Sequence, residues 1–459
     1  MYIPTYYKTY FFTFYGEPQN TVVEYNKISS GYIQCFIKAQ DVNDAIDRAT
    51  LEIKRNKWNI QDLYYAPVEL PNGVFPPGTE YINVAKSVEE TGSGFLYVGI
   101  SRDGKSYKAP FNFQRNDFVD NKSFFNKKRK ILNRKECLHF NAGPGCNSII
   151  KSHSIQNHHQ LDTIARNSHV YTINFDNPRH IGTYTLKGIK EMSTFHGFCG
   201  KHDNELFHPI DDYPFSDSGE QAMLYAYRAL CKEIYTKQNA YQLVMAGYES
   251  ISNEESKDDL RCHVIGQYSG LCSLKKAKNF YDNSLRLKNY SDAHYLLFII
   301  SGKMNIVFSS LIEPDYDFSG NILQDLGDLS KDLQLITYSS VWISDVEWGF
   351  LFSWHKEYDE ICLKYIGNSL EKCYKLSDFN DYLFRLTIVC ENSAFSPDWW
   401  EALSEQQRVE ITDYSNNIID LFSKLRNDYL VHGLERICDW HISSIKTNVK
   451  ELKGIINSY

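Results

Sequence analysis

Four residues of the types that bind zinc occur as two pairs in the middle of this chain. Cys137 and Cys146 form the first pair, and Cys199 and His202 form the second in a C-x-x-H arrangement. Three thiolates and one imidazole suit the tetrahedral coordination of a structural zinc ion. The Gly-Pro-Gly run at 143–145 favours a tight turn that directs Cys146 back toward the metal. The pattern predicts a structural zinc site, and the alternative is two unrelated buried pairs.

The cysteine pattern of the whole chain favours metal binding by the clustered cysteines over disulfide formation. The chain has 11 cysteines, an odd number, and most occur singly within apolar runs, as Cys390 does. The N-terminus lacks the basic and apolar regions of a secretory leader. The longest apolar run, residues 295–300, is far too short to span a bilayer. We therefore expect a cytoplasmic protein without a membrane partner, in which clustered cysteines bind metal.

A basic segment directly precedes the first pair. The formal net charge of the chain is −8, so any nucleic-acid binding must come from a local patch. Residues 122–135 are rich in lysine and arginine, with phenylalanines interleaved, a pattern that can bind a phosphate backbone. The alternative is a solvated face of a helix or loop. The candidate nucleic-acid-binding residues are Lys127, Lys128, Arg129, Lys130, Arg134 and Lys135. The sequence leaves open whether the chain has a protein partner or associates with itself.

Residues 135–210 resemble the HNH, or treble-clef ββα-metal, nuclease family. In that family a zinc-knuckle pair precedes a strand that ends in a catalytic histidine, and an asparagine and a histidine follow the second pair. The segment IIKSHSIQ is similar to that strand, with His153 at the general-base position, and Asn204 and His208 follow the C-x-x-H pair. The resemblance implies a nuclease, one use of which is bacterial defence. In it His153 deprotonates water and a Mg²⁺ or Mn²⁺ ion stabilises the scissile phosphate.

The sequence departs from the family pattern beside this histidine. Ser152 occupies the position where the family usually has an acidic residue, and Asp203 is a candidate for the missing carboxylate. His153 can alternatively be a zinc ligand or a histidine of the core. The phrase KSHSIQ…STF.GFC.KHDNELF is also similar to one in uncharacterised bacterial proteins. We expect residues 119–240 to form a treble-clef-like zinc module, either a nuclease or a non-catalytic module that binds protein or nucleic acid.

The N-terminal part shows the patterns of two strands, a helix and a third strand. Residues 7–15 and 32–39 are rich in aromatic and β-branched side chains, which favour strands. A helix is expected after Asp41, a suitable N-cap, because apolar residues follow at i, i+3 and i+4 spacing. A further strand follows within residues 60–69. These patterns predict an α+β layer over residues 1–118, with its helix on one side of the sheet.

The C-terminal part is expected to form an antiparallel sheet with helices, over residues 241–459. A long helix that begins near Ser218 should pack on the central module. The apolar runs 294–300 and 304–312 predict a hairpin of buried strands. A helical pattern runs to about Trp440 at the end of the chain. The whole protein is therefore expected to belong to the α+β class.

Overall fold

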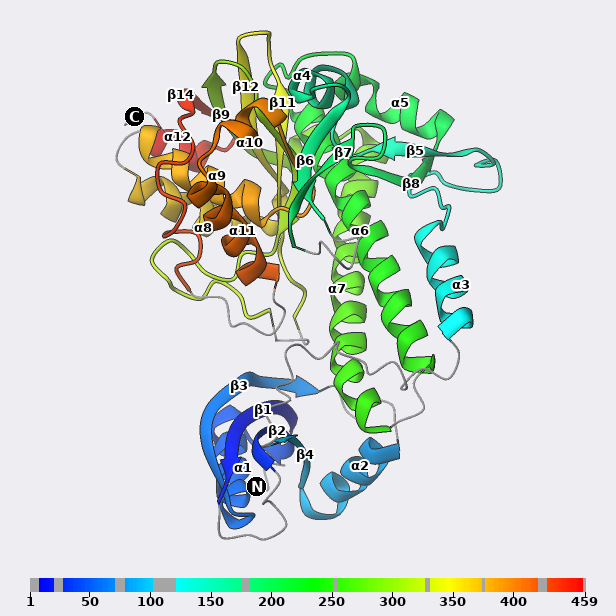
Figure 1. The fold of residues 1–459 in the computed structure, drawn as a ribbon, viewed down its shortest axis with the longest axis vertical. Coiled ribbons are helices and arrows are strands. Elements are labelled where there is room, and N and C mark those ends of the chain that lie inside the picture. The colour runs from blue at the N-terminus through cyan, green and yellow to red at the C-terminus, as the bar shows by residue number, and fades with distance from the viewer. Residues whose placement is uncertain are drawn as a thin grey trace, which may run out of the picture. The chain divides into compact units, whose positions relative to one another are not determined.

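The computed structural model divides the chain into two compact units. It describes residues 8–19, 28–70, 79–101, 121–174, 182–250, 254–326, 331–373, 376–419 and 427–456. The first unit takes residues 1–127, 241–269 and 325–332, and the second takes residues 128–240, 270–324 and 333–459. Both units combine helices with antiparallel sheets (Figure 1), as expected for the α+β class. The three-part division of the chain at residues 118 and 240 stays a prediction.

The first unit contains a four-stranded sheet with a helix on each face. The strand order is β3-β1-β2-β4. Phe12 and Cys35 share a buried cluster with Ala49 of α1, whereas Phe36 packs with Val88 of α2 on the opposite face. The predicted sequence of two strands, a helix and a strand is confirmed, but α2 was not predicted. The bounds are β1 Lys8–Pro18, β2 Ile28–Ala39, α1 Val42–Arg55, β3 Trp58–Leu70, α2 Thr79–Thr91 and β4 Ser93–Ser101.

The second unit contains an eight-stranded antiparallel sheet and a separate two-stranded sheet. The large sheet has the order β14-β9-β12-β11-β10-β13-β6-β7, and β5 pairs with β8. The strands are β5 Ile149–His153, β6 His169–Ile173, β7 Tyr184–Gly188, β8 Thr194–Cys199, β9 Ala293–Ser301, β10 Ile306–Ile312, β11 Ile336–Trp342, β12 Glu347–His355, β13 Ser393–Phe395 and β14 His441–Thr447. The helices from residue 121 onward include α3 Asn121–Leu132, α4 Asp162–Ile164, α5 Gly200–Asp211, α6 Gly219–Ser250, α7 Glu254–Leu287, α8 Asp359–Lys372, α9 Phe379–Val389, α10 Pro397–Ala402, α11 Glu405–Ile419 and α12 Lys450–Ile456.

Helices cover both faces of the large sheet. On β12, the Phe352 ring stacks on Tyr382 of α9, with the ring centroids 6.3 Å apart. The next residue, Ser353, points to the other face and donates a hydrogen bond of 3.2 Å to the carbonyl oxygen of Ala222 in α6. Because successive side chains of a strand alternate between faces, both faces of this sheet are buried.

The predicted hairpin of residues 294–300 and 304–312 is wrong. These segments form β9 and β10, but β9 pairs with β12 and β14, and β10 pairs with β11 and β13. A strand that is buried on both faces is apolar along its whole length, so its sequence does not specify its neighbour. The two strands are close in sequence and separated by two others in the sheet.

The predicted helix that continues to Trp440 is also wrong. Helix α11 ends at Ile419, and the described residues 427–440 form turns before β14. Gly433, Leu434 and Arg436 have φ values of 96°, 59° and 61°. A right-handed helix cannot continue through three residues in the left-handed region.

The segment between the two Cys/His pairs is built into the large sheet. Its strands β6 and β7 pair with each other, and β6 pairs with β13 through Tyr171 and Phe395. The insert therefore ties the β5–β8 pair to the sheet. Within the part of the chain that the structure describes, no helix combines the length and the apolar character needed to cross a membrane.

A buried histidine beside α7 generates a prediction about acid stability. The Ser284 hydroxyl donates to Asp292 (2.6 Å) and lies 3.1 Å from Nε2 of His355, while the Glu357 N–H donates to His355 Nδ1 (3.3 Å). Burial lowers the pKa of His355 below its ordinary value. As the pH falls through the unfolded value of about 6.5, the unfolded chain gains a proton first, so folding stability is lost with acid.

We expect His355→Gln to reduce the loss of thermal stability between about pH 7.5 and about pH 5.5. Differential scanning fluorimetry of the wild type and the variant across that range measures the effect. His441→Gln is the control, because His441 is exposed on β14. Equal pH dependence in all three proteins would contradict the role of His355.

Candidate metal centre

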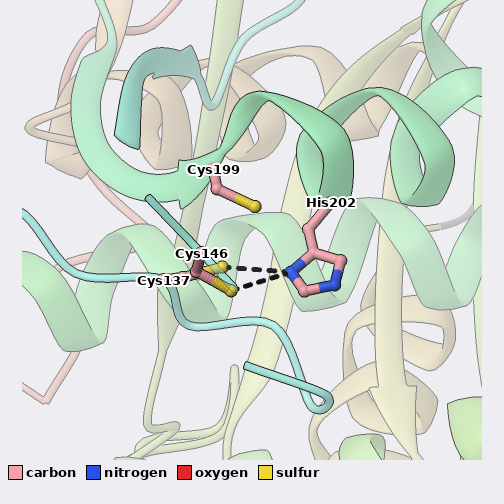
Figure 2. Close-up of side chains that lie close together, drawn as sticks. All are labelled: Cys137, Cys146, Cys199 and His202. Carbon is pink, nitrogen blue, oxygen red and sulfur yellow. Dashed lines mark hydrogen bonds between the residues drawn. The ribbon is translucent and has the colours of Figure 1, made fainter. Parts of the chain in front are cut away.

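The four zinc-type residues predicted from the sequence come together in the second unit. The ligand atoms of Cys137, Cys146, Cys199 and His202 all lie within 4.8 Å of one another. The sulfurs of Cys137 and Cys146 lie 3.4 Å and 3.5 Å from Nδ1 of His202. Figure 2 shows the four side chains converging on one space. This group can hold a metal ion.

Backbone hydrogen bonds place the first pair of ligands. Beside Cys137, the N–H of Leu138 donates to the carbonyl oxygen of Gly197 in β8 (2.8 Å), so the segment runs along that strand. The Cys146 N–H donates to the carbonyl oxygen of Gly143 (3.0 Å), which closes the turn expected from the Gly-Pro-Gly run. These two hydrogen bonds bring Cys146 back beside Cys137, which precedes it by nine residues.

The second pair lies where a strand becomes a helix. Cys199 is the last residue of β8 and the N-cap of α5, and His202 belongs to the first turn of that helix. Strand β5 holds β8 in register, with Ile149 opposite Cys199. A C-x-x-H pair at this point directs both side chains to the same side of the helix start, because residues three apart are neighbours on a helix.

The donor set is that of a closed structural site. Burial raises the pKa of Cys137 to about 11, and the Gly143 N–H lowers the pKa of Cys146. Zinc binds thiolates and neutral imidazole, so binding displaces the thiol protons. Four protein ligands complete a tetrahedron and leave no open position for a substrate. The chemistry of these residues therefore fits a structural zinc ion.

His139 is a feature of the centre that the sequence did not reveal. Its ring stacks on His202 with centroids 4.0 Å apart and an angle of 11°, and on its other neighbour, Phe140, also at 4.0 Å. Burial lowers the pKa of His139 to about 4, with smaller contributions from His202 and Lys278. A neutral ring in this position packs against the ligand imidazole. Its place between the two cysteines was the only sequence signal.

Side chains of helices α6 and α7 hold the loop between Cys137 and Cys146 in position. The buried Tyr227 hydroxyl lies 3.0 Å from the carbonyl oxygen of Leu138 and 2.8 Å from the Asp282 carboxylate. Lys278 pairs with the same carboxylate at 2.8 Å. Arg286 donates a hydrogen bond of 2.7 Å to the carbonyl oxygen of Phe140. The loop is therefore positioned by helices that lie far from it in the sequence.

His153 ends β5, as the family resemblance implied, and lies beside an ion pair between a buried arginine and a partly exposed aspartate. Arg228 of α6 donates to the Asp211 carboxylate (2.7 Å) and covers the ring of Phe207 at 4.2 Å. Burial lowers the pKa of His153, and the charge of Arg228 lowers it further, whereas Asp211 raises it. Burial raises the pKa of Asp203, and Arg228 opposes that shift. His153 therefore shares the surroundings of Arg228 with two carboxylates of α5.

The two other proposed catalytic residues are also carried by α5. The side chains of Asn204 and His208 are exposed, one helical turn apart. His208 is hydrogen-bonded to Asp212, and its ring meets Tyr213 edge-on at 5.4 Å. The charged residue of α5 that affects His153 is Asp211, and Asp203 shares Arg228 and Asp211 as neighbours. The supporting roles of Asn204 and His208 stay predictions.

A hydrogen-bond network fixes the chain just after His153. The side-chain amide of Asn392 donates to Ser154 Oγ (2.9 Å), which lies 2.6 Å from Ser193 Oγ. Ser193 Oγ in turn accepts a hydrogen bond of 2.8 Å from the N–H of Ile155. A cavity of about 360 Å³ opens beside Ser193 and Asn392. The end of β5 and the start of β8 are therefore held together from the cavity side.

Two of the six basic candidates already have partners within the chain. Arg134 is hydrogen-bonded to Glu136 and to Asn239 (3.2 Å), and it lies over the ring of Tyr235 at 4.7 Å. Lys127 pairs with Glu249 at 3.0 Å. The remaining four are exposed and are Lys128, Arg129, Lys130 and Lys135.

The contact between Tyr227 and the loop carries a prediction about stability. Tyr227→Phe removes the hydroxyl and leaves a buried carbonyl and carboxylate short of one donor. We expect a loss of about 1–3 kcal/mol in the free energy of unfolding, measured by urea denaturation. Tyr213→Phe is the matched control, because Tyr213 is 56% exposed. A loss no larger than that of the control would show that Tyr227 does not hold the loop.

Known proteins provide no guide to this centre. Comparison with protein-family models, with curated proteins and with solved structures gives no match to the chain. The Cys₃His group and its surroundings are therefore the observations on which a function can be argued.

Proposed function

We propose that this protein is a metal-dependent nuclease of HNH-like type, whose β5–β8–α5 unit is organised by a structural zinc ion. The convergence of Cys137, Cys146, Cys199 and His202 carries the zinc part of the proposal. The order of a loop with two ligands, two paired strands and a helix with two ligands supports a treble-clef-like module. A bacterial defence role belongs to the same proposal and rests on the family resemblance alone.

Metal content is the first prediction. We expect the purified protein to contain about one zinc ion per chain, and Cys199→Ala to lose it together with thermal stability, because structural zinc is coupled to folding. Cys362→Ala is the matched control: Cys362 is also buried in the second unit but lies outside the group. Inductively coupled plasma mass spectrometry measures the metal.

A second variant separates metal binding from misfolding. Cys146 is only partly buried in its loop, so Cys146→Ser disturbs the core less than Cys199→Ala does. Full zinc content in both variants would refute the assignment of these residues as zinc ligands.

The surroundings of His153 support the catalytic part of the proposal. Its lowered pKa keeps the imidazole neutral near pH 7, the form that a general base needs. In the proposed reaction His153 takes a proton from water, the water oxygen bonds to phosphorus, and the bond to the leaving oxygen breaks. A Mg²⁺ or Mn²⁺ ion supplies the stabilisation of charge on the phosphate. Two carboxylates of α5 are candidates for the acidic residue that Ser152 replaces: Asp211, which acts on His153, and Asp203, which interacts with the Ser152 side chain.

One observation favours the alternative, a non-catalytic zinc module that binds protein or nucleic acid. Arg228 is 3% exposed and lies 2.7 Å from the Asp211 carboxylate, so a fixed positive charge already compensates this site. A guanidinium in that place disfavours a second cation nearby. Under this alternative the Arg228–Asp211 pair only holds α5 against α6.

A cleavage assay distinguishes the two functions. With Mg²⁺ or Mn²⁺ added, we expect the wild type to cut DNA or RNA and His153→Ala to lose at least about a hundredfold in rate, the usual scale of general-base catalysis. His158→Ala is the control, because His158 is exposed and bonded to Asp162. Undiminished cutting by His153→Ala would refute the assignment. A wild type that retains zinc and cuts neither substrate would establish the binding module instead.

A further inference from the structure

The outer face of the β5–β8 pair is basic. Lys151 on β5 is exposed and His196 on β8 is half-buried, whereas their neighbours Ser152 and Phe195 are buried. Lys151 lies where the register of β5 against β8 shifts, between Ile150 and Ser152, and Ile150 and Lys151 are both exposed. The side of the strand pair that carries Lys151 and His196 is therefore the side open to solvent. Neither residue belongs to the basic segment that the sequence singled out.

The segment before Cys137 adds a third basic residue to this face. The Glu136 N–H donates to the carbonyl oxygen of His196 (3.1 Å), which places Lys135 alongside β8. Burial lowers the pKa of His196, and the charges of Lys135 and Lys151 lower it further, so the three groups lie within electrostatic reach of one another. The acidic neighbour Glu136 is hydrogen-bonded to Arg134.

We infer that the outer face of β5–β8, formed by Lys135, Lys151 and His196 and continued by the exposed residues Lys128–Lys130, binds the phosphate backbone of a nucleic acid. The exposed lysines of this face, Lys135 and Lys151, form a local positive surface in a chain of net charge −8, which is complementary to a polyanion, and the imidazole of His196 between them offers a hydrogen-bonding group. The inference rests on the proposed function for its nucleic-acid partner. It differs from the sequence prediction by including residues 151 and 196 and by omitting Lys127 and Arg134.

The position of Lys151 connects this surface to the proposed chemistry. Lys151 precedes His153 by two residues on β5, a distance of roughly 7 Å along a strand. The proposed phosphate-binding surface and the proposed general base are therefore carried by the same short strand. Contacts to phosphate position a nucleic acid without reading its sequence. The surface is thus suited to binding that depends on charge.

Binding can be measured without cleavage. We propose fluorescence anisotropy with short fluorescein-labelled DNA and RNA oligonucleotides, in a His153→Ala background without added Mg²⁺ or Mn²⁺. The test variant combines Lys135→Glu with Lys151→Glu. The control combines Lys303→Glu with Lys453→Glu, two exposed lysines of the same unit with the same change in charge. Zinc content and the thermal midpoint of each variant confirm that it is folded.

We expect the test variant to bind at least about tenfold more weakly than the control. We also expect the slope of log K against log salt to become shallower by about 1–2, because each lost phosphate contact removes about 0.9. Equal affinity and slope in the test and control variants would overturn the inference, and so would a wild-type surface that binds neither oligonucleotide.

The outcome is separable from that of the nuclease proposal. Weakened binding by the test variant, together with no cleavage by the wild type, would support the binding surface and refute the nuclease proposal. Cleavage by the wild type with unchanged binding by the test variant supports the nuclease and removes this surface.

Discussion

The interaction on which the centre depends is the approach of three cysteine sulfurs and one imidazole nitrogen to within 4.8 Å of one another. The loop between Cys137 and Cys146 contains few apolar residues, and Leu138 is the one that is buried. Such a loop cannot be held by hydrophobic burial alone. A dication bound by the thiolates would turn their mutual repulsion into attraction and close the loop, so that metal binding would contribute directly to folding. The same ion would fix β8 and the first turn of α5, which carry the other two ligands.

Helix α6 links this centre to the proposed site around His153. Two consecutive residues of α6 contact the two sites. Tyr227 reaches the carbonyl oxygen of Leu138 in the loop, and Arg228 pairs with Asp211 of α5. A shift of α6 would therefore disturb both the first pair of ligands and the surroundings of His153. Through this shared support the Cys/His group and the surroundings of His153 are both embedded in the larger fold. Strands β6 and β7 embed it further by joining the large sheet.

Local structure was predictable where the local sequence carries the physical cause. Asp41 caps α1 as expected, accepting a hydrogen bond of 2.9 Å from the Asp44 N–H. The strand that the family resemblance implied before His153 is also present and ends at that residue. The pairing of β9 and β10 was not predictable, because a strand buried on both faces has no alternating pattern that distinguishes its neighbours. The turns after residue 427 depend on positive φ values at Leu434 and Arg436. Leucine and arginine rarely adopt such values, so the sequence does not predict these turns.

The sequence by itself determined the ligand set of the metal centre, because cysteine and histidine at these spacings have few other uses in a cluster. Only the tertiary structure decided what surrounds His153, because its neighbours Arg228 of α6 and Asp211 of α5 belong to elements distant from it in the chain. It also decided which basic residues gather on one face, since Lys151 and His196 meet Lys135 only through the pairing of β5, β8 and the segment before Cys137. Ligand chemistry is a property of residue types, whereas electrostatic surroundings are a property of distances that folding alone sets.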